Sequence, residues 1–91
     1  MGIVGNAGEK MGKKISLVEM RAGEKGKVVE IQGGYGMTRR LEALGIREGK
    51  EIKKLSAQLM RGPVVIQVSN TRVAIGFGMA RRIIVEVSEN D

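Results

Sequence analysis

The 91-residue sequence contains no cysteine, histidine or tryptophan, and only one phenylalanine and one tyrosine. The missing cysteines exclude disulfides and thiolate ligands, and the missing histidines remove the commonest metal ligand and the usual general base. There is no nucleophile motif of the G-x-S-x-G type and no complete phosphate-binding loop. The glutamates are spread over predicted turns and alternate strand faces. We therefore predict that the protein is not an enzyme and has no catalytic residue, cofactor or metal site.

Long apolar runs are also missing. No segment approaches the roughly 18 consecutive apolar residues that a membrane span needs, and the apolar pair near the start is too short for a secretion signal. We therefore expect no membrane insertion. The lack of cysteine fits a reducing compartment.

Positive charge is what the sequence has in excess. Lysine and arginine number 16 against 10 aspartates and glutamates, which gives a net charge of +6. Such a balance favours an anionic partner, which is a nucleic acid, a membrane surface or an acidic protein. Because aromatic side chains that stack on bases are scarce, we expect no specific nucleic-acid binding. A single domain of this length has a thin core, so weak self-association is also expected.

One short helix is predicted at residues 37–44. Met37, Leu41 and Leu44 share one face, at spacings of four and three residues. Gly45 supplies a left-handed end, and Ile46 would then contact Leu41 as in a Schellman motif. A helix this short is marginal alone, so it must pack on a sheet. Glycines are assigned to the structural turns on either side, namely Gly33, Gly34 and Gly36 before the helix, Gly45 at its end and Gly49 after it.

The rest of the pattern predicts about six short strands, at residues 15–17, 27–32, 50–56, 64–68, 71–75 and 83–87. Residues 64, 66 and 68 share a face, as do 73 and 75, and 83, 85 and 87. Val29 and Ile31 are assigned to one face of their strand. Ile52 and Leu55 are out of phase, which indicates a bulge or a sharp bend. We predict a mainly β fold, a small closed barrel with one inserted helix, and an open meander is the alternative.

The two ends of the chain differ from this pattern. Residues 1–14 contain four glycines and no periodicity, so they are assigned to a flexible leader, within which Met11 is an alternative start. Residues 15–87 form the predicted barrel. Residues 88–91, with the sequence SEND, are assigned to an acidic tail.

The order of these motifs resembles the ferrous-iron transport protein A (FeoA) family. The most specific part is R-R-L-x-x-L-G-I-x-x-G at residues 39–49, followed by Gly62-Pro63 and a strand–turn–strand through residue 75. The resemblance covers about residues 15–87 and implies an SH3-like barrel. It also implies a cytoplasmic accessory protein of ferrous-iron uptake, whose partner is the membrane iron transporter that carries a GTPase domain.

A second resemblance covers less of the chain. Gly23, Gly26 and Val28, with Ile31, are similar to the KOW element of SH3-like barrels that bind RNA or ribosomal proteins. This element spans about ten residues and leaves the helix unexplained. A KOW-like nucleic-acid- or ribosome-binding module is therefore the alternative function.

Two arginine pairs are candidate partner contacts. Arg39 and Arg40 fall in the first turn of the predicted helix, where the helix dipole disfavours cations. A misplaced charge there indicates docking, a neutral surface choice or an ion pair with a neighbouring strand. Arg81 and Arg82 are the second pair, and docking is weighed there against the same alternatives.

The segment before Gly62-Pro63 is a third candidate. Leu59 and Met60 are apolar residues in a predicted loop, next to Arg61. They either cover the end of the barrel or form an apolar docking patch with the arginine at its rim.

Overall fold

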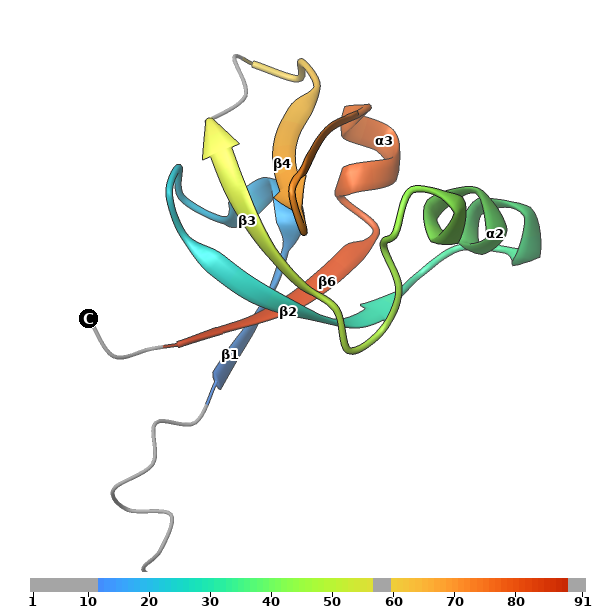
Figure 1. The fold of residues 1–91 in the computed structure, drawn as a ribbon, viewed down its shortest axis with the longest axis horizontal. Coiled ribbons are helices and arrows are strands. Elements are labelled where there is room, and N and C mark those ends of the chain that lie inside the picture. Colours follow the sequence, from blue (N-terminus) through green and yellow to red (C-terminus); the bar gives the residue numbers. More distant parts are fainter. Residues whose placement is uncertain (1–11, 57–59, 89–91) are drawn as a thin grey trace, which may run out of the picture.

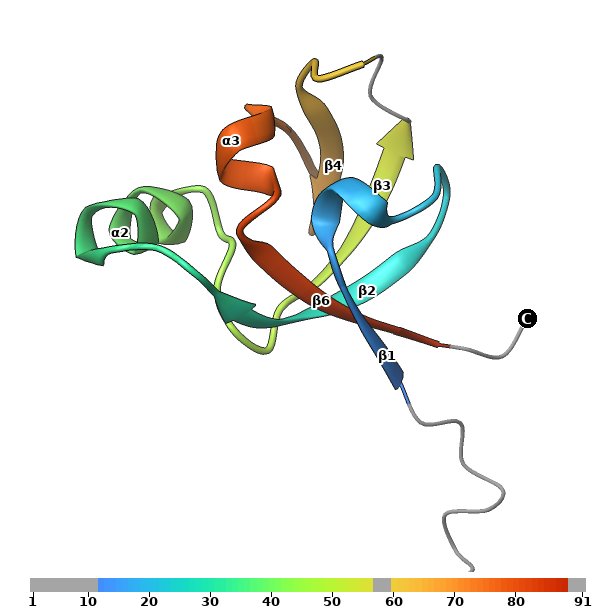
Figure 2. The same ribbon diagram turned by 180° about the vertical axis from the view of Figure 1, so that it is seen from behind.

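The computed structural model describes residues 12–56 and 60–88, and within them six antiparallel strands form one sheet. The strands follow one another across the sheet in the order β1-β6-β2-β3-β4-β5. Figure 1 and Figure 2 show the sheet curling around a common centre, with helix α2 projecting to one side. The strands are β1 Gly12–Ser16, β2 Lys25–Ile31, β3 Glu51–Ser56, β4 Val64–Val68, β5 Thr71–Ile75 and β6 Ile83–Ser88; the helices are η1 Leu17–Glu19, α2 Tyr35–Ala43 and α3 Phe77–Ala80.

The predicted mainly β, SH3-like architecture is confirmed, including a helix inserted between the second and third strands. The sheet is open rather than fully closed, because β1 and β5 are its two edges. Short helices occupy the junction where closure was expected. At the end of β1, the Ser16 hydroxyl donates to the carbonyl of Arg81 at 3.0 Å, just after α3. This contact connects the two ends of the sheet without a strand ladder.

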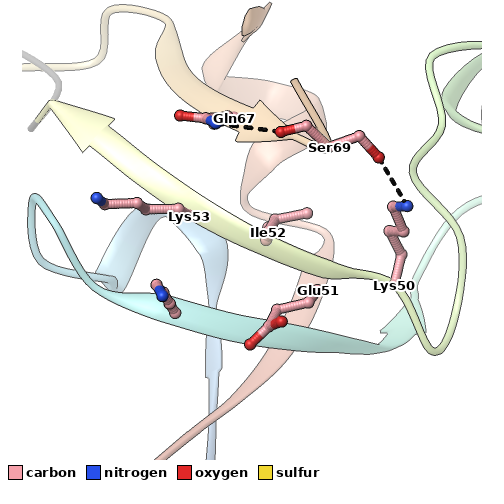
Figure 3. A pocket seen from close by; sticks show the side chains of 7 residues that line it. Lys50, Glu51, Ile52, Lys53, Gln67 and Ser69 are labelled. Atoms are coloured by element: carbon pink, nitrogen blue, oxygen red, sulfur yellow. Dashed lines mark hydrogen bonds between the residues drawn. The ribbon is translucent and has the colours of Figure 1, made fainter. Parts of the chain in front are cut away.

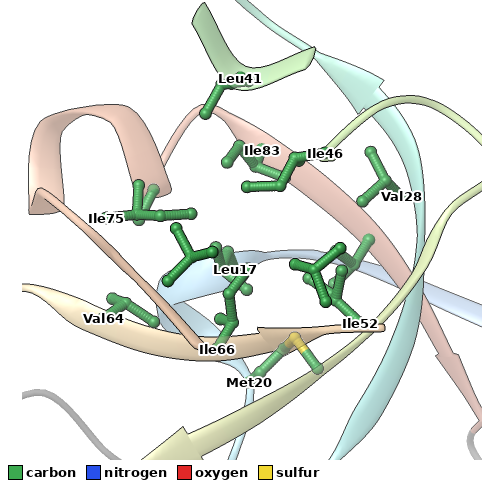
Figure 4. Packing of buried hydrophobic residues seen from close by; sticks show 14 of the residues in the cluster. Leu17, Met20, Val28, Leu41, Ile46, Ile52, Val64, Ile66, Ile75 and Ile83 are labelled. Carbon is green, nitrogen blue, oxygen red and sulfur yellow. The ribbon is translucent and has the colours of Figure 1, made fainter. Parts of the chain in front are cut away.

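The concave side of the sheet holds the apolar core (Figure 4). The inward faces predicted for β4, β5 and β6 are confirmed. The side chains at positions 64, 66, 68, 73, 75, 83, 85 and 87 are all buried. The turn at Gly45 and Ile46 and the helix η1 cover the rest of the core. Leu17, in η1, and Ile46 are both fully buried. The buried apolar residues are Leu17, Met20, Val28, Leu41, Ile46, Ile52, Val64, Ile66, Val68, Val73, Ile75, Ala80, Ile83, Val85 and Val87.

The first strand differs from the prediction. It begins at Gly12, and Leu17 belongs to η1, which Ser16 caps. Residues 12–14, assigned to the leader, therefore pair with the end of β6, with Gly12 opposite Ser88 and Lys14 opposite Glu86. The residue pattern did not indicate a strand at these positions, because an edge strand can carry exposed lysines. The predicted leader from residue 1 to 11 and the tail at 89–91 lie outside the described residues.

Both central strands carry a bulge. The predicted irregularity in β3 is confirmed, because its register with β4 shifts between Lys54 and Ser56. A second register shift lies in β2, between Val28 and Glu30. The prediction that Val29 shares a face with Ile31 is wrong, since Val28 is fully buried and Val29 only partly so, because the bulge changes the alternation there.

Helix α2 ends as the sequence predicts. Gly45 has φ +91°, and the Ile46 amide donates to the Leu41 carbonyl at 2.9 Å, which is the long hydrogen bond of a Schellman motif. The helix begins two residues earlier than predicted, so Gly36 lies inside it rather than in a turn. Leu44 is 44% exposed, so the predicted apolar face is anchored by Leu41 with partial cover from Met37.

Candidate partner-binding surfaces

Helix α2 presents an arginine–tyrosine pair to solvent. The Arg39 side chain donates from Nη1 to the Tyr35 hydroxyl at 3.2 Å, and its guanidinium carbon lies 5.4 Å from the centre of the ring. The Tyr35 side chain holds this cation against the first residue of the helix. Because α2 begins at Tyr35, the prediction that Arg39 and Arg40 lie in its first turn is wrong, and Arg40 lies in the last turn, where the helix dipole favours a cation. Arg40 is exposed beside it. Tyr35 is 76% exposed and was not predicted as a contact, although the chain's only tyrosine in a glycine-rich segment was a usable signal.

The loop before β4 presents an apolar side chain and a stacked arginine. Met60 is 87% exposed, in a left-handed backbone conformation with φ 57°. Arg61 lies with its guanidinium carbon 5.8 Å from the centre of the Phe77 ring. Because Phe77 begins α3, this contact places Arg61 beside that helix. Leu59, the other residue of the predicted patch, lies outside the described residues.

Arg81 and Arg82 follow α3, and both side chains are exposed. The Arg82 carbonyl accepts a hydrogen bond at 2.8 Å from the Gln32 amide, just before the segment that leads into α2. The structure therefore brings Arg61 and this arginine pair around α3, and it connects the end of α3 to the start of the segment that carries Arg39 and Arg40. Whether these positions bind a partner stays a prediction.

A buried lysine was missed by the sequence analysis. Lys54 is 1% exposed, and its ammonium group donates to the carbonyls of Leu17 at 3.3 Å, Val18 at 3.1 Å and Met20 at 2.7 Å. Burial lowers the pKa of Lys54 below its ordinary value of 10.5, while the nearby charge of Glu24 acts in the opposite direction. These bonds fix η1 and the residue after it against β3, so the role of Lys54 is structural. The only usable signal was its position two residues after Ile52, on the same face.

A shallow groove of about 300 Å³ lies over β3 and its neighbours, and it was not predicted either (Figure 3). Lysines from two strands contribute to its lining. The Lys50 ammonium donates to the Ser69 hydroxyl at 2.9 Å, and the Gln67 side-chain amide donates to the Ser69 carbonyl at 3.1 Å. The lining residues are Lys25, Lys50, Glu51, Ile52, Lys53, Gln67 and Ser69.

A second cavity of about 280 Å³ lies between β2, α2 and the turn that follows the helix. It contains two carboxylates, from Glu42 and Glu48, with Arg47 beside them. Within residues 12–56 and 60–88, no three metal-ligating side chains gather at one place. Two carboxylates beside a guanidinium are a poor cation site, so the prediction that the protein holds no metal of its own stands as a prediction.

Comparisons with known proteins give the family. The model of the FeoA domain matches residues 15–87. A protein of Methanocaldococcus jannaschii named for Fe(2+) transport protein A is 38% identical over 69 residues, which are 76% of this chain and 82% of that protein. A crystal structure of an iron uptake regulatory protein (FeoA) is 38% identical with a TM-score of 0.76, and the match covers 81% of this chain and 97% of that one.

A manganese-dependent transcriptional repressor shares the fold alone, at 24% identity with a TM-score of 0.75. The match covers 92% of this chain and 47% of the repressor. In the part of the chain that the structure describes, no helix is long and apolar enough to cross a membrane. The FeoA match also includes the helix that the KOW-like alternative left unexplained. This chain belongs to the FeoA family, an accessory family of ferrous-iron transport that is not known as an enzyme family.

Proposed function

We propose that this protein binds the cytoplasmic part of a ferrous-iron transporter and modulates iron uptake without performing chemistry itself. The observation that carries the proposal is the family match over residues 15–87, together with 38% identity to a protein named for Fe(2+) transport. The transporter, with its GTPase domain, is the partner that the family resemblance implies. Ferrous iron is then the cargo of the transporter rather than a ligand of this chain.

The surface chemistry supports a binding role. Exposed arginines surround α3 and line the outer side of α2, and Met60 offers an almost fully exposed apolar side chain. In our proposal, Met60 and Leu59 form the apolar anchor, with Arg61 at the rim. The arginine pairs at 39–40 and 81–82 form a second, basic contact region. Electrostatic attraction then speeds the encounter. The apolar anchor, which becomes buried in the interface, holds the complex together.

The test is a pull-down with the cytosolic part of the transporter, followed by titration of a Leu59→Ser, Met60→Ser double variant. We expect the variant to keep its fold and to bind at least tenfold more weakly, about 1.4 kcal/mol. A Leu44→Ser variant is the control, because Leu44 is also partly exposed but lies on another element. Unchanged affinity in the folded double variant removes the anchor. Normal ferrous-iron uptake in a cell that lacks the protein removes the functional proposal.

A further inference from the structure

Two neighbouring rows of side chains cross the outer face of the sheet, and their charges are arranged differently. Strand register defines each row, because residues directly opposite one another on adjacent strands point to the same face. The paired row is Lys14, Glu86, Lys27 and Glu51, from β1, β6, β2 and β3. The basic row is Lys25, Lys53, Gln67 and Arg72, from β2, β3, β4 and β5.

The paired row alternates in sign at every step, so each lysine faces a carboxylate across the ladder. Opposite charges in such positions stabilise a sheet by about 0.2–1 kcal/mol, and like charges destabilise it. The basic row contains the unfavourable arrangement, since Lys25 lies directly opposite Lys53. Within the described part of the chain, neither of these lysine side chains has a hydrogen-bond or ion-pair partner. No hydrogen bond or ion pair of these two side chains within the described residues therefore offsets the repulsion.

The basic row coincides with the groove over β3. Lys25, Lys53 and Gln67 belong to both, and Lys50 adds a further ammonium group at one end. Figure 3 shows the ammonium groups of Lys50 and Lys53 at opposite ends of the groove. The arrangement suits a ligand whose negative charges are spread along its length.

The polar groups of the groove favour a polypeptide over a nucleic acid. Glu51 contributes a carboxylate, which can accept a hydrogen bond from a peptide N–H group, whereas the phosphate groups of a nucleic-acid backbone offer it no donor. Its lining includes no aromatic side chain on which a base would stack. An acidic polypeptide offers carboxylates to the lysines and backbone donors to Glu51, so it matches both charge signs in the groove.

We propose that the basic row and its groove bind an acidic, extended segment of a protein partner. The segment's carboxylates neutralise Lys25 and Lys53, and Arg72 extends the basic surface towards the β5 edge. The inference rests on the proposed function only for the source of the segment, which is the cytoplasmic part of the transporter. It adds a docking surface on the sheet, separate from the loop and helices described above.

The test uses the full-length chain and a blocked ten-residue peptide of alternating glutamate and serine, followed by two-dimensional amide NMR. We expect the largest shifts at the amides of β2, β3 and β4. Lys25→Gln with Lys53→Gln should weaken binding by about fivefold or more, because two charge contacts are lost. The matched control, Lys13→Gln with Lys14→Gln, removes the same charge from β1 and should weaken binding by less than about twofold.

Equal weakening by the two double variants would overturn the site, because it would show a response to net charge alone. Largest shifts outside β2–β4 would overturn it as well. Oligothymidylate and pyrophosphate are titrated in parallel, and tighter binding of either one at these strands would overturn the choice of a polypeptide. The peptide experiment does not involve the transporter. Failure of the transporter pull-down with a positive peptide result therefore contradicts the proposed function and leaves the docking surface standing.

Discussion

Lys53 and Lys54 are consecutive lysines of β3 with opposite environments. The side chain of Lys54 points into the molecule, is 1% exposed and donates to three carbonyls. The side chain of Lys53 points outward, lies opposite Lys25 and has no partner among the described residues. The alternation of a strand gives one lysine a structural role on the inner face and places the other on the outer face, where we propose that it binds a partner. The net charge of +6 describes neither role, because it counts both lysines alike.

The inner face should show the largest response to substitution. Leu41 is the buried contact through which α2 packs on the core, and it is fully buried. Leu41→Ala should lower the free energy of unfolding by about 2–5 kcal/mol, through lost burial and a residual cavity. Urea denaturation measures the change. Leu44→Ala, on the same helix but 44% exposed, should cost much less. Equal effects of the two variants would mean that α2 does not pack through Leu41.

The next largest difference in stability should be that between substitutions of Lys54 and of Lys53. Lys54→Met removes the donor for three carbonyls and should lower the free energy of unfolding by about 3 kcal/mol, since hydrogen bonds to a charged group are worth about 1.5–3 kcal/mol. Lys53→Met is the matched control and should change it by no more than about 1 kcal/mol, because Lys53 loses only the repulsion across the strand pair. Chemical denaturation of both variants at pH 7 gives the comparison. A Lys54→Met variant that is as stable as the Lys53→Met variant would contradict the structural role of Lys54.

The pH dependence of stability should report on Lys54 as well. Its pKa is lowered by burial, so the folded protein releases this proton at a lower pH than the unfolded chain does. Between the lowered value and 10.5, the unfolded state binds more protons, and the contribution of Lys54 to stability therefore rises with pH. The difference in unfolding free energy between the wild type and Lys54→Met should widen as the pH approaches 10.5. A difference that narrows would mean that the pKa is raised.

The smallest effects should come from the outer face. Lys53→Gln relieves the repulsion with Lys25 and should raise the free energy of unfolding by about 0.2–1 kcal/mol, whereas Lys27→Gln removes a cation that faces two carboxylates and should lower it by a similar amount. Both shifts should shrink at high salt. Shifts of the same sign would show that the two rows do not differ as the register indicates.

Local patterns in the sequence predicted the helix end and most of the strand faces. Gly45 followed by Ile46 was enough to predict the Schellman motif, because that motif depends on a few adjacent residues. Strict alternation likewise predicted the buried side chains of β4, β5 and β6. Strand β1 was placed too late because its pairing with β6 joins residues that are far apart in the sequence, such as Gly12 and Ser88, and leaves no local apolar pattern.

The site was less predictable than the fold. Lys54 was missed because a lysine is rarely buried, and its acceptors come from η1 and the residue after it, which are distant in sequence. The basic row depends on which residues of four strands lie opposite one another, and the bulge in β3 changes the register between β3 and β4. The exposed arginines were identifiable from sequence, whereas their grouping around α3 required the tertiary structure.

Titration of the transporter's cytosolic part into this protein tests the central claim most directly. The account predicts saturable binding that weakens with salt and falls by about fivefold or more in the Lys25→Gln, Lys53→Gln variant. The Lys13→Gln, Lys14→Gln variant, which loses the same charge, should bind nearly as the wild type does. Absence of binding by the folded wild-type protein at low salt would contradict the account.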